Sequence, residues 1–176
     1  GYDIFNAIDS YIINKNCKDF FTILDFGSGY GRLGAMFSNE GDKHTYISVD
    51  CVEGSYIVQN LFLSLLNPSN FYEYFDYEFL NKTFKIKKEK SIYHIPSWRL
   101  DLVENQSVDL ITSVFVLPEI NEFALLKFIY DAKKVLRKGG YIYIRDHLYQ
   151  TGDKTHKGGH KLDTENELKK AGFESI

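Results

Sequence analysis

The sequence predicts an α/β protein with a Rossmann-like, doubly wound and mostly parallel sheet. Short apolar segments alternate with segments of helical spacing along the whole chain, as they do where helices cover both faces of a parallel sheet. The first apolar segment ends in a glycine-rich turn, at the point where such sheets bind ligands. With 176 residues, of which 44% are hydrophobic, the chain is long enough to form one domain, 1–176, around a buried core.

Five segments are predicted to be strands. Each is a short apolar run, rich in β-branched and aromatic residues, between polar or turn-forming residues. In chain order they are 20–26, 45–49, 91–96, 108–116 and 141–145.

Helical spacing of apolar residues fills most of the intervals between these strands. The predicted helices lie within the first twenty residues, around Leu33, Met36 and Phe37, and at 55–66, 119–136 and 163–171. Gly139 and Gly140 are predicted to close the long fourth helix. Residues 67–90 have the least regular pattern, and we expect them to be an insertion. The residues after 145 contain one predicted helix, so the final strands of a full doubly wound sheet are expected to be missing.

Charge and cysteine content narrow the function classes. The net charge of −3 argues against a nucleic-acid partner, because such proteins usually carry a basic surplus. Cys17 and Cys51 form no CxxC pair, and no Cys/His spacing is typical of a zinc site, so no metal is expected. No apolar run approaches the length of a membrane span. A reducing cytoplasm is the simplest location for such a chain, and the oligomeric state is left open.

Two glycine frames fit the turn after the first strand. Gly29-x-Gly31-x-x-Gly34 fits the dinucleotide fingerprint, with an acid at about the spacing expected for ribose binding. Asp25-x-Gly27-x-Gly29-x-Gly31 instead ends the strand at Asp25 and leaves its carboxylate beside the turn. We favour the second frame, because the first would place an acid and a glycine inside a buried central strand. A tight turn that binds no ligand is the remaining interpretation.

Asp50 follows the second predicted strand, about twenty residues after the glycines. A carboxylate at the end of that strand can accept hydrogen bonds from both hydroxyls of a ribose. The alternative role is a helix cap or a solvated loop residue, which is common for aspartate. The position at a strand end favours the ligand-binding role.

Four segments, in the same order along the chain, resemble motifs of the class I S-adenosylmethionine (SAM)-dependent methyltransferases. They are 23–31, 46–50, 107–113 and 132–140, and the resemblance extends over 20–147. It implies a seven-stranded Rossmann-like sheet and transfer of the methyl group of SAM. It also implies that the methionine part of SAM lies at the glycine turn and the ribose at Asp50. The implied turn residues are Asp25, Gly27, Ser28, Gly29 and Gly31.

The sequence departs from the family pattern after the third predicted strand, where an acidic residue is often found. Pro96, Ser97 and Trp98 occupy that region, and we expect Trp98 to stack on the adenine of SAM. Residues 95–98 and 116–120 are similar to segments of bacterial sugar O-methyltransferases that are encoded with surface polysaccharide genes. This narrower resemblance implies a glycan as the methyl acceptor.

Three residues near the ends of the last two predicted strands are candidates for acid–base chemistry. His147 and Asp146 follow the fifth predicted strand, and a histidine there suits the general base that a hydroxyl acceptor needs. Glu119 follows the fourth strand and can orient the acceptor. A structural or solvated role is the alternative for His147, and an interaction with the helix dipole is the alternative for Glu119.

The sequence therefore predicts a SAM-dependent methyltransferase that acts on a hydroxyl of a small molecule or a sugar, in polysaccharide biosynthesis if the narrower resemblance holds. An NAD-linked Rossmann oxidoreductase is the first alternative, and it rests on the other glycine frame. A non-catalytic SAM-binding module is the second alternative, because the acceptor region is expected to be incomplete.

Overall fold

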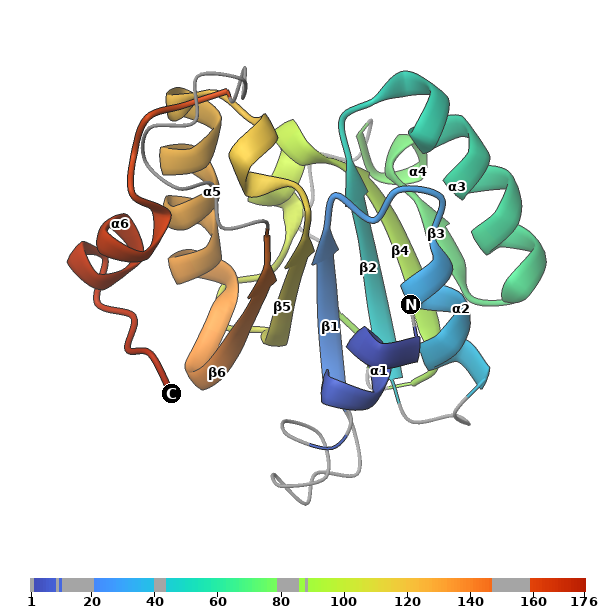
Figure 1. Cartoon of the computed structure of the whole chain (residues 1–176). Coiled ribbons are helices and arrows are strands. Elements are labelled where there is room, and N and C mark those ends of the chain that lie inside the picture. The colour runs from blue at the N-terminus through green and yellow to red at the C-terminus, as the bar shows by residue number, and fades with distance from the viewer. Residues whose placement is uncertain are drawn as a thin grey trace.

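The computed structural model describes residues 2–8, 10, 21–39, 44–78, 86–87, 89–146 and 159–176. Its centre is a six-stranded sheet in the order β3-β4-β2-β1-β5-β6, and every neighbouring pair is parallel (Figure 1). The strands are β1 (Phe21–Phe26), β2 (His44–Asp50), β3 (Phe71–Glu73), β4 (Ser91–Pro96), β5 (Val108–Val114) and β6 (Leu136–Arg145). The predicted doubly wound α/β fold is confirmed.

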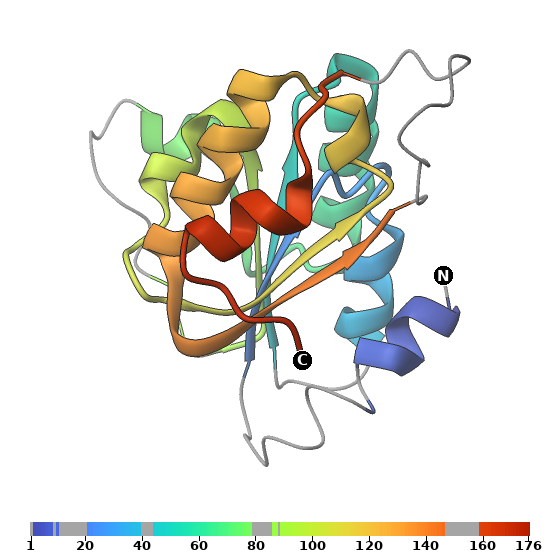
Figure 2. The same cartoon turned by 60° about the vertical axis from the view of Figure 1, so that its left-hand side comes forward.

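Helices cover both faces of the sheet, and the sheet separates the hydrophobic core into two clusters. The elements are α1 (Tyr2–Ile8), α2 (Arg32–Asn39), α3 (Glu53–Leu66), α4 (Tyr74–Glu78), α5 (Glu122–Val135) and α6 (Thr164–Lys170), with 3-10 helices η3 (Ser97–Leu102) and η4 (Leu117–Glu119). Ile8, Phe37 and Leu63 of α1, α2 and α3 pack on one face. Helix α5 packs on the other face, with α6 against its outer side (Figure 2).

The strand order reverses at β1. The chain runs from β1 to β2 and then to the edge strand β3, adds β4 between β3 and β2, and returns to place β5 on the other side of β1. Parallel sheets of this kind bind ligands beyond the carboxyl ends of their strands, at the point where the order reverses. The glycine turn after β1 lies at that point (Figure 1).

The segment predicted to be an insertion, 67–90, contributes to the sheet itself. Its residues Phe71–Glu73 form β3, the edge strand beside β4, and α4 follows directly. The prediction missed β3 because three residues are too few to show a strand pattern.

The prediction for the long helix was wrong at both ends. Helix α5 begins at Glu122, where Asn121 caps it by accepting a hydrogen bond from the amide of Ala124 over 2.9 Å. The helix ends at Val135 and β6 begins at once, so Gly139 and Gly140 lie inside a strand and do not close the helix. Gly139 has a φ of +73° and lies close to a shift of register between β5 and β6. This backbone conformation explains why the position is a glycine.

Candidate functional site

The glycine turn depends on backbone conformations that favour glycine. The φ angles of Gly27, Gly29 and Gly31 are +78°, +61° and +85°. A Cβ atom on Gly27 would lie 2.2 Å from Cγ2 of Val116, so the turn packs directly on the segment that follows β5. A Cβ on Gly29 would meet no atom within 4 Å. Gly27 is therefore required for packing, whereas Gly29 presents bare backbone to open space.

Asp50, the last residue of β2, holds the turn in place. Its Oδ2 accepts a hydrogen bond from the amide of Gly29 over 3.1 Å and another from Nε2 of Gln59 over 3.0 Å. Its Oδ1 accepts from the amides of Cys51 and Val52, at 2.7 and 3.0 Å. The four donors occupy both oxygens, so any further donor must share an oxygen with one of them or replace it. The structure brings Gly29 and Asp50 together, as expected for two parts of one site.

Asp25 lies deeper than the sequence interpretation assumed. It is the fifth residue of β1, only 4% exposed, and β1 continues to Phe26 before the turn. Its Oδ1 accepts a hydrogen bond from Thr112 over 2.7 Å, and its Oδ2 accepts one from the hydroxyl of Tyr46. Burial raises the pKa of Asp25 to about 6, although these two hydrogen bonds oppose the rise.

The expectation that β1 ends at Asp25 was therefore wrong, and so was the argument that a central strand would exclude this acid. A buried carboxylate is tolerated here because hydroxyl groups on both neighbouring strands donate to it. Asp25 lies beneath the turn, and a direct contact with a ligand stays a prediction.

Three polar residues that the sequence interpretation did not assign connect the turn to the edge of the sheet. Gln59 of α3 and His94 of β4 are fully buried, and His94 is hydrogen-bonded both to Gln59 and to Glu73 of β3. Nε2 of Gln59 donates to the carbonyl oxygen of Gly29 as well as to Asp50. The sequence did contain one signal for this set. Gln59 lies four residues before Leu63, so a polar side chain occupies the inward, otherwise apolar face of the helix.

Ser28 also joins this set, because its hydroxyl lies 2.7 Å from that of Ser48 on β2. The Ser48 hydroxyl in turn donates to Oε1 of Gln59 over 2.8 Å. The turn is thus fixed through its backbone at Gly29 and through the side chain of Ser28.

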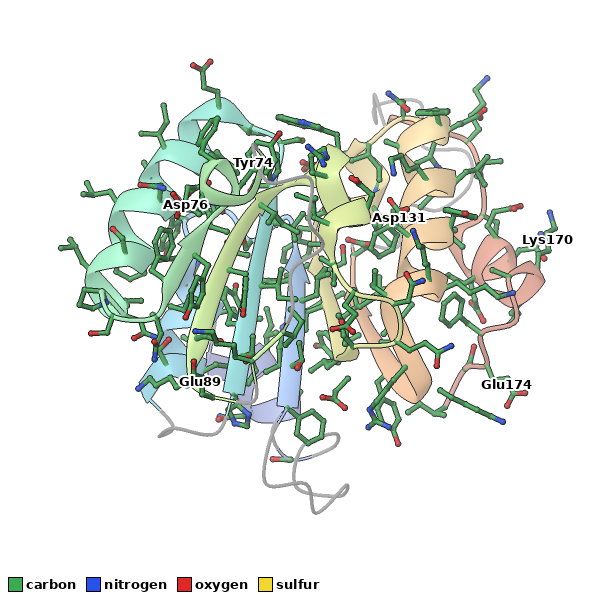
Figure 3. The ribbon with its side chains drawn as sticks, turned by 180° about the vertical axis from the view of Figure 1, so that it is seen from behind. Tyr74, Asp76, Glu89, Asp131, Lys170 and Glu174 are labelled. Carbon is green, nitrogen blue, oxygen red and sulfur yellow. The ribbon has the colours of Figure 1, made fainter. Side chains whose placement is uncertain are left out.

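Trp98 lies on η3, directly after β4, and its side chain is 58% exposed. Pro96 pairs with Asp50 in the sheet, so Trp98 comes two residues after a strand end that lies beside the strand end of Asp50. A large aromatic ring that remains exposed at this edge is available to stack on a planar ligand. The carboxyl edge of the sheet is at the top of Figure 3. Tyr74, on the same side of the sheet as η3, lies at that edge, whereas Glu89 lies at the opposite edge.

The ends of β5 and β6 form the other side of the site. Phe115 has a φ of +58°, which a phenylalanine rarely adopts, and its amide donates to the carbonyl oxygen of Arg145 over 2.8 Å. The amide of Val116 donates to Oδ1 of Asp146 over 3.2 Å. Asp146 thus fixes the residue on which Gly27 packs, and its predicted catalytic role is untested. The sequence interpretation did not identify Phe115.

Glu119 is exposed at the end of η4, not in the first turn of α5 as predicted. His160 Nε2 donates to the carbonyl oxygen of Leu117 over 2.8 Å and so holds residues 159–160 against η4. His147 lies outside the described residues. Among the residues that the structure describes, no group of three His, Cys, Asp or Glu side chains is arranged to hold a metal ion. None of the described helices combines the length and apolar character needed to cross a membrane.

Known structures share this fold. A protein of Bacillus halodurans described as a methyltransferase matches with a TM-score of 0.64 and 16% identity, over 99% of this chain and 70% of that one. A SAM-dependent methyltransferase of Aquifex aeolicus gives 0.56 and 19%, over 95% and 82%. A protein of Galdieria sulphuraria described as a sarcosine dimethylglycine methyltransferase gives 0.66 and 14%, over 97% and 61%. No family model matches the sequence, and neither does any curated protein.

These identities lie below the level at which shared activity follows from shared structure, so the similarity establishes the fold. The sheet and its flanking helices are those of the class I methyltransferase type. The chain covers 61% of the length of the Galdieria protein and 82% of the length of the Aquifex protein. What the site does must therefore be argued from its own residues.

Proposed function

We propose that this protein is a SAM-dependent methyltransferase. The observation that carries the proposal is the hydrogen bond between Gly29, which presents bare backbone to open space, and Asp50 at the end of β2. This pair lies where the strand order reverses, the position at which doubly wound sheets bind nucleotide-like ligands. The similarity to a SAM-dependent methyltransferase of Aquifex aeolicus agrees with this proposal.

The residues at the site fit the chemical parts of SAM. Gly29 offers a close approach for the methionine part, Asp50 offers acceptors for the ribose, and Trp98 offers a ring face for the adenine. Gly27, Ser28 and Gly31 shape the turn, and Asp25 supports it from below. When bound, SAM supplies a methyl group already activated by a positively charged sulfur, so the chain mainly has to orient the acceptor.

The acceptor side of the proposed site is formed by the ends of β5 and β6. Glu119 is exposed there and can accept a hydrogen bond from an acceptor hydroxyl. Asp146 fixes Val116 and thereby the wall against which the turn packs. We propose a hydroxyl of a small molecule or a sugar as the acceptor, in polysaccharide biosynthesis in the cytoplasm, with His147 as its general base.

Packing accounts for Gly34, the last glycine of the dinucleotide frame. A Cβ there would lie 2.6 Å from the ring of Tyr46, so the glycine lets α2 approach β2 closely. In the frame that suggested an NAD-linked oxidoreductase, one glycine is thus required by the contact between α2 and β2. The third glycine of a dinucleotide fingerprint has the same packing role, so Gly34 does not distinguish the two frames. The SAM frame is favoured by Gly27, which begins the turn directly after β1 with a φ of +78° and lies outside the dinucleotide frame.

Calorimetry with SAM, S-adenosylhomocysteine and NAD in parallel tests the proposal. We expect the wild-type protein to bind SAM with a Kd of about 10 µM or tighter and to show no comparable affinity for NAD. Incubation with methyl-labelled SAM and a cell extract then identifies the molecule that gains the label. SAM affinity without any labelled product would favour a SAM-binding module, and NAD affinity without SAM affinity would overturn the proposal.

A further inference from the structure

A row of polar side chains crosses the whole sheet at one level of the strand register. Neighbours along the row are paired residues of adjacent parallel strands, so their side chains lie on the same face. From β3 to β6 the row is Glu73, His94, Ser48, Asp25, Thr112 and Tyr143. Gln59 of α3 covers one half of the row and connects it to the glycine turn.

The hydrogen bonds of Gln59 fix the orientation of its amide. Nε2 lies against the carbonyl oxygen of Gly29 and against Asp50 Oδ2, both of which can only accept. The reversed amide would place Oε1 against these two oxygens. Oε1 therefore faces the other way, where it accepts from the hydroxyl of Ser48 and lies 3.1 Å from Nε2 of His94. Since Oε1 is an acceptor, Nε2 of His94 must carry a proton.

The other ring nitrogen of His94 must also carry a proton. Nδ1 lies 2.7 Å from Oε2 of Glu73, and that carboxylate also accepts from the hydroxyl of Tyr56, the amide of Tyr74 and Nδ2 of Asn60. These three donors alone favour the ionised form of the Glu73 carboxyl. An ionised Glu73 can only accept, so Nδ1 donates to it.

The buried imidazole of His94 thus donates one hydrogen bond to Gln59 and one to Glu73, and its ring also stacks on that of Tyr56 at a centroid distance of 3.9 Å. A buried polar group is costly unless it is hydrogen-bonded, and here both ring nitrogens are. This arrangement has a defined geometry, because each ring nitrogen has one partner. It can therefore hold Gln59 in one position.

We propose that His94, held by Glu73, is a positioning residue for the cofactor: it fixes the amide of Gln59, which fixes the Gly29 peptide and the Asp50 carboxylate in the arrangement that binds SAM. This inference rests on the function proposed above and adds to it a chain of three residues that reaches from the sheet edge to the turn. His94 itself lies inside the protein and acts only through Gln59.

Two amide substitutions of His94 separate positioning from simple loss of stability. In His94→Gln, the amide nitrogen takes the place of Nε2 and can still donate to Gln59. In His94→Asn, the shorter side chain takes the place of Nδ1, so it can reach Glu73 but not Gln59. We expect His94→Gln to bind SAM within about threefold of the wild-type Kd. We expect His94→Asn to bind at least about tenfold more weakly, because Oε1 of Gln59 loses one of its two hydrogen bonds and keeps only that from Ser48.

Thr45→Val is the matched control. Thr45 is buried on β2, but its hydroxyl donates to the carbonyl oxygens of Lys87 and Glu89 at the opposite edge of the sheet. We expect this variant to lower the melting temperature as much as the His94 variants do and to leave the Kd for SAM unchanged. A further readout is the nitrogen NMR spectrum of His94 in the wild-type protein, which should show protons on both ring nitrogens.

The outcomes distinguish this inference from the proposed function. If the wild-type protein binds no SAM, the proposed function fails and the cofactor role of His94 fails with it. If the wild-type protein binds SAM and the two His94 variants bind it equally well, only the inference fails. A neutral imidazole in the NMR spectrum would also overturn the inference, even if neither variant folds.

Discussion

The amide of Gly29 donates a hydrogen bond to Oδ2 of Asp50 over 3.1 Å, and this bond joins the turn after β1 to the end of β2. The two residues are 21 positions apart in the sequence. Both lie at the carboxyl edge of the sheet beside the point where the strand order reverses. The contact places bare backbone and a carboxylate side by side, and we propose that this arrangement binds the cofactor.

Substitution of two glycines in the same turn should have different effects. Gly29→Ala adds a methyl group that meets no atom, so we expect a stability loss of about 1–2 kcal/mol from the positive φ alone. Gly27→Ala adds the clash with Val116, and we expect a loss of about 3 kcal/mol or more. SAM affinity should fall at least about tenfold in Gly29→Ala, because the methyl group enters the proposed site.

Urea unfolding and calorimetry measure these two quantities separately. Gly54→Ala is the control for unfolding, because that glycine is helical and its added Cβ also meets no atom within 4 Å. Equal stability losses at Gly27 and Gly29, together with unchanged SAM affinity in Gly29→Ala, would contradict the role given to the turn.

Asp25 should make the stability of the protein depend on pH. Burial raises its pKa from 3.8 to about 6, so between these values the folded protein holds a proton that the unfolded chain has released. The stabilising contribution of the protonated group is therefore complete below about pH 4 and is lost as the pH rises through about 6. In Asp25→Asn, which keeps the shape of the side chain, this dependence should disappear.

The measurement is the free energy of unfolding in urea, for wild type and Asp25→Asn, from about pH 4 to about pH 7. We expect the value for wild type minus that for the variant to fall by roughly 3 kcal/mol over this range, because each unit of pKa shift is worth about 1.4 kcal/mol. A constant difference would show that the buried carboxyl does not titrate in this way.

Trp98 provides a direct optical signal, because the chain contains one tryptophan. Its side chain is exposed at the carboxyl edge, so SAM should quench its fluorescence and shift the emission to shorter wavelengths. Trp98→Phe keeps a ring and should weaken SAM binding by a few-fold, whereas Trp98→Ala should weaken it about tenfold. Leu65→Ala removes exposed apolar surface near the end of α3 and should leave the affinity unchanged. SAM binding without any change in fluorescence would exclude stacking on this ring.

Asp50→Asn should weaken SAM binding by about tenfold to a hundredfold, because it removes a charged acceptor that also orients the turn. The matched substitution is Asp131→Asn on α5, which removes another buried carboxylate, one that pairs with Lys127 over 2.6 Å (Figure 3). That variant should lose stability and keep its SAM affinity. If calorimetry gave the same SAM affinity for both variants, Asp50 would have no special role in binding.

The five long strands, and the place of the candidate residues at the carboxyl ends of two of them, could be predicted because they follow from local patterns. Buried parallel strands are apolar runs, and the glycines and Asp50 follow directly after two of them. Strand β3 was missed because three residues carry no periodicity. The start of α5 was misplaced because Pro118 and Glu119 resemble the first turn of a helix but form η4 instead.

The connections between His94, Gln59 and Glu73 could not be predicted, because they depend on the register of β3, β4 and β2. A shift of one residue between neighbouring strands would place His94 on the opposite face from its partners. The burial of Asp25 was misjudged for a similar reason: the hydroxyls of Tyr46 and Thr112 that donate to its carboxylate come from two other strands.

The most direct test of the central claim is a crystal structure of the protein with S-adenosylhomocysteine, the product that SAM leaves after methyl transfer. We expect the ligand at the carboxyl edge of the sheet, with its amino-acid part at Gly29, its ribose at Asp50 and its adenine against Trp98. A ligand bound elsewhere on the chain, with the amide of Gly29 and the carboxylate of Asp50 facing only each other, would contradict it.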